Sequence, residues 1–175
     1  SFPARFMLVA AMNPCPCGYY NHPEKDCTCP PGAVEKYLNK ISGPLLDRID
    51  LHVEVTPVSF DEISSTRKNE TSSEIRMRVV KAREIQIERF KEFEDIHSNA
   101  MMPAEMVKKI CEISDPGKAL LKKAMERLGL SARAYDRILK VSRTIADLAG
   151  TEDIRIEHLA EAIQYRSLDR ENWAG

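Results

Sequence analysis

Two short apolar stretches near the start of the chain have the length and pattern of β-strands. The first, Arg5 to Met12, is almost unbroken in hydrophobic side chains, which is typical of a strand buried on both faces of a parallel sheet. In the second, Asp50 to Val55, apolar and polar residues alternate. Two strands cannot form a doubly covered sheet, so we expect the remaining strands to precede Ser1 and the chain to be part of a longer protein.

From about residue 71 onward, the spacing of apolar residues changes to that of amphipathic α-helices. The helix-end signals are a Thr71-x-x-Glu74 capping box, Asp115-Pro116 and Ser131 at helix starts, and Gly129 after a helix end. Together with the apolar spacing, these signals predict helices over residues 71–96, 115–128, 131–150 and 156–166, and a further helix that begins at residue 103. A shorter helix is predicted at 33–41. The apolar side predicted for the first long helix consists of Ile75, Val79, Ala82 and Ile85.

These elements predict a remnant of an α/β sheet joined to a helical bundle. We place the α/β part at residues 1–58, with an insert at 14–31 that contains most of the cysteines. A polar stretch at 59–70 fits a linker, the helical part covers 71–168, and a tail with Trp173 covers 169–175.

Composition limits the possible functions without naming one. Of the 175 residues, 43% are hydrophobic and 30% are charged, which suits a folded domain with a well-solvated surface. A net charge of −1 argues against binding nucleic acid through bulk charge, although a local basic face remains possible. No apolar run has the length of a membrane-spanning helix and no secretory leader is evident, so we expect a cytoplasmic protein without a membrane partner.

Four of the five cysteines lie in one loop, in the stretch CPCGYYNHPEKDCTC. The two C-x-C pairs consist of Cys15, Cys17, Cys27 and Cys29. Four thiolates complete a closed tetrahedral zinc site, and a metal would supply the core that this loop of turn-forming residues lacks. His22 can replace one thiolate, and free thiols or disulfides are the alternatives, although a reducing cytosol disfavours disulfides. We predict structural Zn²⁺ here, and we assign Cys111, on an apolar helix side, to the core.

Three polar residues occupy positions where a phosphate can bind. Asn13 follows the first predicted strand, and parallel α/β sheets bind ligands beyond the carboxyl ends of their strands. Arg133 lies in the first turn of a predicted helix, where a cation opposes the helix dipole unless an anion docks beside it. Each residue also has a structural alternative. Asn13 suits a turn, Arg133 suits a solvated surface, and Arg48 can pair with Asp47 or Asp50.

Three motifs in order along the chain carry a family resemblance. They are VAAMNPCPCG at 9–18, SGPLLDRIDLHVEV at 42–55 and LSARAYDRILKVSRTIADLAG at 130–150. On these motifs the chain closely resembles the magnesium-chelatase-like AAA+ ATPases of bacteria, the YifB/ComM family, along nearly its whole length. The resemblance implies a mainly α fold: the C-terminal remnant of a P-loop AAA+ α/β subdomain with a small zinc-binding insert, followed by an α-helical lid bundle.

The same resemblance implies a role for each of the three polar residues. Asn13 matches the sensor 1 residue, which orients the attacking water near the γ-phosphate. Arg48 matches the arginine finger, which reaches into the nucleotide site of a neighbouring subunit, and Arg133 matches sensor 2, which contacts the nucleotide from the lid. The positive charges of Arg48 and Arg133 would stabilise the negative charge that develops on the transferred phosphoryl group. ATP and Mg²⁺ are therefore the expected cofactors of the longer protein, and a homohexamer is the expected assembly.

Within this family, two activities are open. The ComM-type members resemble DNA motors that promote branch migration during natural transformation, whereas the relatives in chlorophyll synthesis drive metal insertion into a porphyrin. The C-x-C pairs favour the ComM branch and hence DNA as a partner. The sequence has no G-x-x-x-x-G-K-[ST] phosphate loop and no acidic Walker B strand before Asn13. We therefore expect the 175-residue chain alone to be inactive as an ATPase.

Two other classes of function remain open from the sequence. The first is a zinc-stabilised nucleic-acid-binding module, whose basic face would comprise Arg76, Arg78, Lys81 and Arg83. Several glutamates follow on the same predicted helix, which favours an ordinary mixed, solvated face. The second is a scaffold or adaptor, in which the three motif residues would have no catalytic role.

Overall fold

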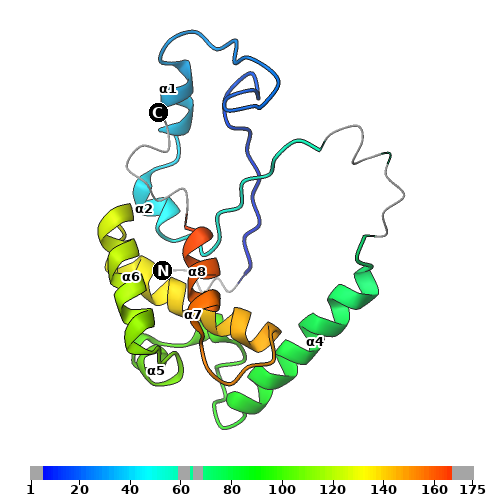
Figure 1. Cartoon of the computed structure of the whole chain (residues 1–175), viewed down its shortest axis with the longest axis vertical. Coiled ribbons are helices and arrows are strands. Elements are labelled where there is room, and N and C mark those ends of the chain that lie inside the picture. Colours follow the sequence, from blue (N-terminus) through cyan, green and yellow to red (C-terminus); the bar gives the residue numbers. More distant parts are fainter. Residues whose placement is uncertain (1–5, 59–63, 65–68, 167–175) are drawn as a thin grey trace. The chain divides into compact units, whose positions relative to one another are not determined.

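The computed structural model describes residues 6–58, 64 and 69–166, which fall into two compact units divided between Ser42 and Gly43. The first unit contains the cysteine loop and helix α1, Ala33–Leu38, and the second contains the remaining helices (Figure 1). Most of the predicted linker at 59–70 and the whole tail at 169–175, with Trp173, lie outside the described residues.

The second unit is built around helix α7. Its helices are α2 (Gly43–Leu46), α4 (Ser72–Arg89), the 3₁₀ helix η1 (Asn99–Met101), α5 (Ala104–Ile110), α6 (Asp115–Leu128), α7 (Ala132–Leu148) and α8 (Ile156–Gln164). Helix α7 packs against α4, α5, α8 and η1, and α6 packs against α8 (Figure 1). The buried apolar residues of α7 recur at helical spacing and join one hydrophobic core with α5, α6 and α8.

Local capping explains where these helices begin and end. Thr71 and Glu74 form the predicted capping box at the start of α4, and the Ser131 hydroxyl accepts a hydrogen bond from the Ala134 N–H at the start of α7. Gly129 ends α6 in the left-handed conformation with φ 61°, as its position predicted. The cap of α6 is Ser114 rather than Asp115, because the Ser114 hydroxyl accepts the hydrogen bond from the Gly117 N–H.

Two predicted helices are shorter than expected. Helix α1 ends at Leu38 instead of residue 41, and α4 ends at Arg89 instead of residue 96. Phe90 follows α4 with a non-helical backbone and buries its ring in the core, which turns the chain away from the helix axis. The predicted apolar side of α4 is buried at Ala82, but Ile75, one turn from the start, is 43% exposed.

The two predicted strands do not form. Neither residues 6–12 nor 50–55 belong to a strand, and the described residues contain only one isolated β-bridge, between Ile113 and Ile154. Phe6 and Val55 are 77% and 85% exposed. A strand exists only when its backbone forms a ladder with a neighbour, and no described segment forms a β-ladder with either stretch. The apolar pattern is typical of a strand, but a strand also needs a second backbone segment to hydrogen-bond with, and the pattern does not provide one.

Candidate metal centre and nucleotide-sensing residues

The four loop cysteines converge in the first unit. Turns at Gly18 and Asn21, both with positive φ, fold the loop so that all four sulfurs lie within 4.8 Å of one another. The Sγ atom of Cys15 lies 3.3 Å from that of Cys17 and 3.7 Å from that of Cys27, and the Cys17 and Cys27 sulfurs are 3.6 Å apart. Tetrahedral zinc, with Zn–S bonds of about 2.3 Å, separates its sulfurs by about 3.8 Å. The cluster therefore has the dimensions of a tetrahedral Cys₄ metal site.

The electrostatics of the cluster also suit a cation. A backbone hydrogen bond from Tyr19 is the largest of the effects that lower the pKa of Cys17 to about 5. A backbone hydrogen bond from Cys17 lowers the pKa of Cys29, but desolvation and the three neighbouring thiols outweigh it and raise this pKa to about 12. Neighbouring thiolates repel one another, so four of them coexist in this cluster only around a compensating positive charge.

The alternatives for this loop can be compared with the same geometry. No cysteine forms a disulfide, and the shortest sulfur separation is well beyond the S–S bond length of about 2.05 Å. His22 does not belong to the cluster: its Nδ1 accepts a hydrogen bond from the Glu24 N–H at 3.1 Å, and its ring lies edge-on to Tyr19. Cys111 is buried in the helical core, as predicted, and burial raises its pKa to about 11.

Arg48 lies just beyond α2 with its side chain exposed. Its guanidinium donates a hydrogen bond to the Pro44 carbonyl at 2.5 Å. The ion pairs suggested as a structural alternative are absent from the described residues, because Asp47 lies 3.9 Å from Arg166 and Asp50 pairs with Arg137. Among the residues that the structure describes, this hydrogen bond is the only polar contact of the Arg48 side chain.

Arg133 lies in the first turn of α7 and is exposed. It makes no hydrogen bond or ion pair with any described residue, and the first turn of α7 contains no acidic side chain. Asn13 is also exposed, on the extended stretch before the cysteine loop in the first unit. Arg48 and Arg133 therefore belong to one unit and Asn13 to the other.

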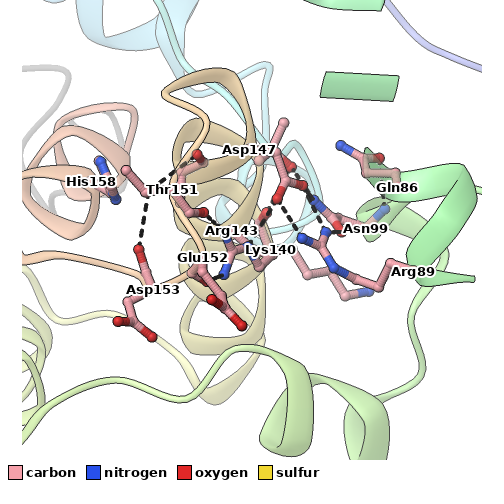
Figure 2. Close-up of polar contacts among 12 residues, drawn as sticks. Gln86, Arg89, Asn99, Lys140, Arg143, Asp147, Thr151, Glu152, Asp153 and His158 are labelled. Carbon is pink, nitrogen blue, oxygen red and sulfur yellow. Dashed lines mark hydrogen bonds and ion pairs between the residues drawn. The ribbon is translucent and has the colours of Figure 1, made fainter. Parts of the chain in front are cut away.

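A buried polar network at the other end of α7 was not predicted from the sequence. Figure 2 shows Arg89, Asn99 and Arg143 converging on Asp147, whose side chain is fully buried. Arg89 donates to both carboxylate oxygens at 2.7 and 2.5 Å, Asn99 Nδ2 donates at 2.7 Å and Arg143 Nε at 3.2 Å. Arg143 also donates to the Thr151 and Glu152 carbonyls. The available signal was Arg143 and Asp147, spaced i, i+4 on the buried side of α7, which is apolar apart from these two residues and Ser142.

The proposed basic face of α4 is mixed in charge. Arg78 pairs with Glu70, and Arg76 and Lys81 line a shallow groove that also contains Glu84. This arrangement is the ordinary solvated surface that the glutamates indicated. Among the described residues, no helix has the length and apolar composition needed to cross a membrane.

Comparison with known proteins covers both units. Residues 1–63 match the family model described as magnesium chelatase, subunit ChlI, and residues 69–166 match the model described as magnesium chelatase, subunit ChlI C-terminal. The chain is 46% identical over 170 residues to competence protein ComM of Haemophilus influenzae, and 41% and 40% identical to the YifB proteins of Salmonella typhimurium and Escherichia coli. These alignments cover 97% of the chain and 32% of each relative, so the chain spans about a third of their length. On these matches, the chain belongs to the magnesium-chelatase-like AAA+ ATPases of the YifB/ComM family.

Proposed function

We propose that this chain supplies the nucleotide-sensing residues and the helical lid of an ATP-driven motor that remodels DNA. The observation that carries the proposal is Arg133, an exposed cation at the amino end of a 17-residue helix with no partner among the described residues. The helix dipole and the free N–H groups favour an anion at this end. Both the helix dipole and the Arg133 guanidinium would stabilise a phosphate bound there. Contacting the nucleotide phosphate in this way is the role of sensor 2.

Arg48 is proposed as the arginine finger. The exposed guanidinium of Arg48 makes one hydrogen bond to the described part of the chain, and it can leave the Pro44 carbonyl at little cost, since water replaces that bond. In the nucleotide site of a neighbouring subunit it would offset the charge that develops on the transferred phosphoryl group. Such a finger contributes about 10³–10⁵ in rate. Asn13, at the end of its extended stretch, is proposed as sensor 1, and ATP with Mg²⁺ as the nucleotide.

The cysteine cluster is proposed to hold one structural Zn²⁺. Cys15 is fully buried and the other three thiols are partly buried, so the site is closed rather than open to a substrate. The metal would fix the loop and the extended stretch that carries Asn13, because this loop has few apolar side chains of its own to bury. Zinc thus has a structural role here and takes no part in phosphoryl transfer.

The test uses the full-length homo-oligomer. Arg48→Ala should abolish turnover while leaving ATP binding nearly intact, because the finger acts on a neighbouring site. Mixing these subunits with subunits that lack the phosphate-loop lysine should restore part of the activity, since some interfaces then pair a sound site with a sound finger. Mixed hexamers of confirmed mass without any recovery would contradict a role for Arg48 across the interface.

Arg133→Ala should behave differently, because sensor 2 contacts the nucleotide itself. We expect weaker ATP binding or poor coupling between hydrolysis and lid movement. Arg127→Ala is the matched control, since Arg127 is an exposed arginine in the last turn of α6, where no phosphate is proposed. Equal effects of the two substitutions on ATP affinity would contradict the assignment of Arg133.

The choice of DNA over a porphyrin rests on the ComM relative and the cysteine loop, whereas both matched family models are described as magnesium chelatase. Metal insertion into a porphyrin is therefore the second candidate. Forked DNA should stimulate ATP hydrolysis by the full-length protein, and stimulation should weaken as salt rises. Stimulation by a porphyrin, with none by DNA, would favour the second candidate.

A further inference from the structure

Residues 43–52, here called the finger segment, surround Arg48 and belong to the same unit as α7 and α8. Arg166, which follows α8 and is fully buried, contacts the residues on both sides of Arg48. Its guanidinium donates to the Ile49 carbonyl and lies 3.9 Å from the Asp47 carboxylate. The backbone that carries Arg48 is therefore held from both sides, while the Arg48 side chain is exposed and bonded to the Pro44 carbonyl.

A second contact joins the finger segment to α7. Asp50 pairs with Arg137, which lies one helical turn after Arg133. Residues four apart lie on the same face of a helix, so the finger segment is docked on the face that presents Arg133. The Arg137 and Asp50 side chains are 28% and 55% exposed. A pair this exposed adds little to folding stability, so its main effect is on where the segment sits.

The third contact is a backbone hydrogen bond that reports on docking. The His52 N–H donates to the Tyr165 carbonyl, at the end of α8, at 2.8 Å. His52 is itself buried, and its Nε2 lies 3.2 Å from the Leu46 carbonyl within the segment. This amide is protected from solvent only while the segment remains against α8.

We propose that Arg137 and Arg166 are positioning residues that dock the finger segment onto the lid helices, so that Arg48 and Arg133 move as one body. The inference rests on the proposed function and adds a mechanical link to it. The arginine for the subunit's own nucleotide and the arginine for its neighbour would shift together. A lid movement caused at one nucleotide site would then displace Arg48 in the nucleotide site of the adjacent subunit.

Docking itself can be tested without any activity, by hydrogen exchange in the 175-residue chain. Asp50→Asn and Arg137→Gln should each speed exchange at the His52 amide by about 1.5- to 5-fold, the factor that corresponds to a surface ion pair. Glu88→Gln is the matched control, because it removes an exposed ion pair with Lys91 that does not contact the segment. An unchanged His52 rate in both Asp50→Asn and Arg137→Gln would overturn the docking role of this pair.

The link to catalysis is tested in the full-length protein by exchanging the two charges. Asp50→Arg and Arg137→Asp should each lower kcat by about three- to tenfold with little change in KM for ATP, and the double substitution should recover at least half of the loss. Arg166→Lys, which keeps the charge but not the two-sided contact, should lower kcat in the same way.

These outcomes separate the two proposals. If Arg48→Ala abolishes turnover but the charge exchange gives no recovery, the positioning inference fails and the finger assignment stands. If Arg48→Ala leaves turnover unchanged, the finger assignment fails, and the coupling of Arg48 to the lid fails with it. In that case faster exchange at His52 would still show a docked segment, without a role in hydrolysis.

Discussion

Replacing Asp147 by asparagine should destabilise the helical unit severely, although the two side chains have nearly the same shape. The fully buried Asp147 carboxylate accepts hydrogen bonds from Arg89, Arg143 and Asn99 (Figure 2). The amide nitrogen of an asparagine would turn N–H donors toward guanidinium donors. The substitution also removes the carboxylate that pairs with both Arg143, which is buried, and Arg89, which is 19% exposed.

The magnitude follows from the charges that are left behind. Breaking a buried ion pair by removing one partner costs about 3–5 kcal/mol, because the other charge remains desolvated without compensation. A domain of this size has a total stability of about 5–15 kcal/mol, so Asp147→Asn should remove about a fifth of it or more. With a urea dependence of about 2 kcal/mol per molar, the unfolding midpoint should fall by about 2 M.

The assay is urea unfolding followed by far-UV circular dichroism, because the helices dominate that signal. Asp153→Asn is the control, since this exposed carboxylate lies in the loop before α8 and should change stability by less than about 0.5 kcal/mol. A double-mutant cycle with Arg89→Ala should give a coupling energy of about 1–3 kcal/mol. A loss below about 1 kcal/mol for Asp147→Asn would refute the view that this network holds α4 to α7.

Three further predictions concern metal, nucleotide and thiol chemistry. Protein purified without added zinc should contain about one equivalent of Zn²⁺, and unchanged metal content after Cys27→Ser with Cys29→Ser would contradict the site. The 175-residue chain alone should neither hydrolyse ATP nor bind it tightly, because it lacks a phosphate loop. Micromolar affinity for ATP in calorimetry would contradict this prediction. Because burial raises the pKa of Cys111 to about 11, iodoacetamide at pH 8 should modify it roughly a hundredfold more slowly in the folded protein than in urea, with Cys111→Ser identifying the signal.

Features set by neighbouring residues were predictable from the sequence. The capping box at Thr71 and Glu74, the cap at Ser131 and the helix end at Gly129 each depend on a few consecutive positions, and all three predictions are confirmed. The cysteine cluster belongs to the same class, since a short loop rich in turn formers brings two C-x-C pairs together. Local chemistry is sufficient for such features because their partners are close in the sequence.

Features that need a distant partner were not predictable in this way. The strand patterns at 6–12 and 50–55 specify an apolar surface, but a β-ladder requires another backbone beside it. The partners of Asp147 come from α4, η1 and α7, and Asp50 pairs with a residue 87 positions away. Apart from the i, i+4 spacing of Arg143 and Asp147, neither sequence spacing nor propensity encodes which of many arginines will meet a given aspartate.

The charges at the two ends of α7 are the basis of our proposal that Arg133 contacts a ligand. Both ends carry a charge that opposes the helix dipole: Arg133 in the first turn and Asp147 in the last. At the buried end the fold compensates Asp147 with Arg89 and Arg143, because an isolated charge in the core would be too costly. At the exposed end no described side chain compensates Arg133, and solvent makes its charge inexpensive to keep. The same helix thus neutralises one unfavourable charge internally and presents the other to solvent, where an anionic ligand such as a nucleotide phosphate can reach it.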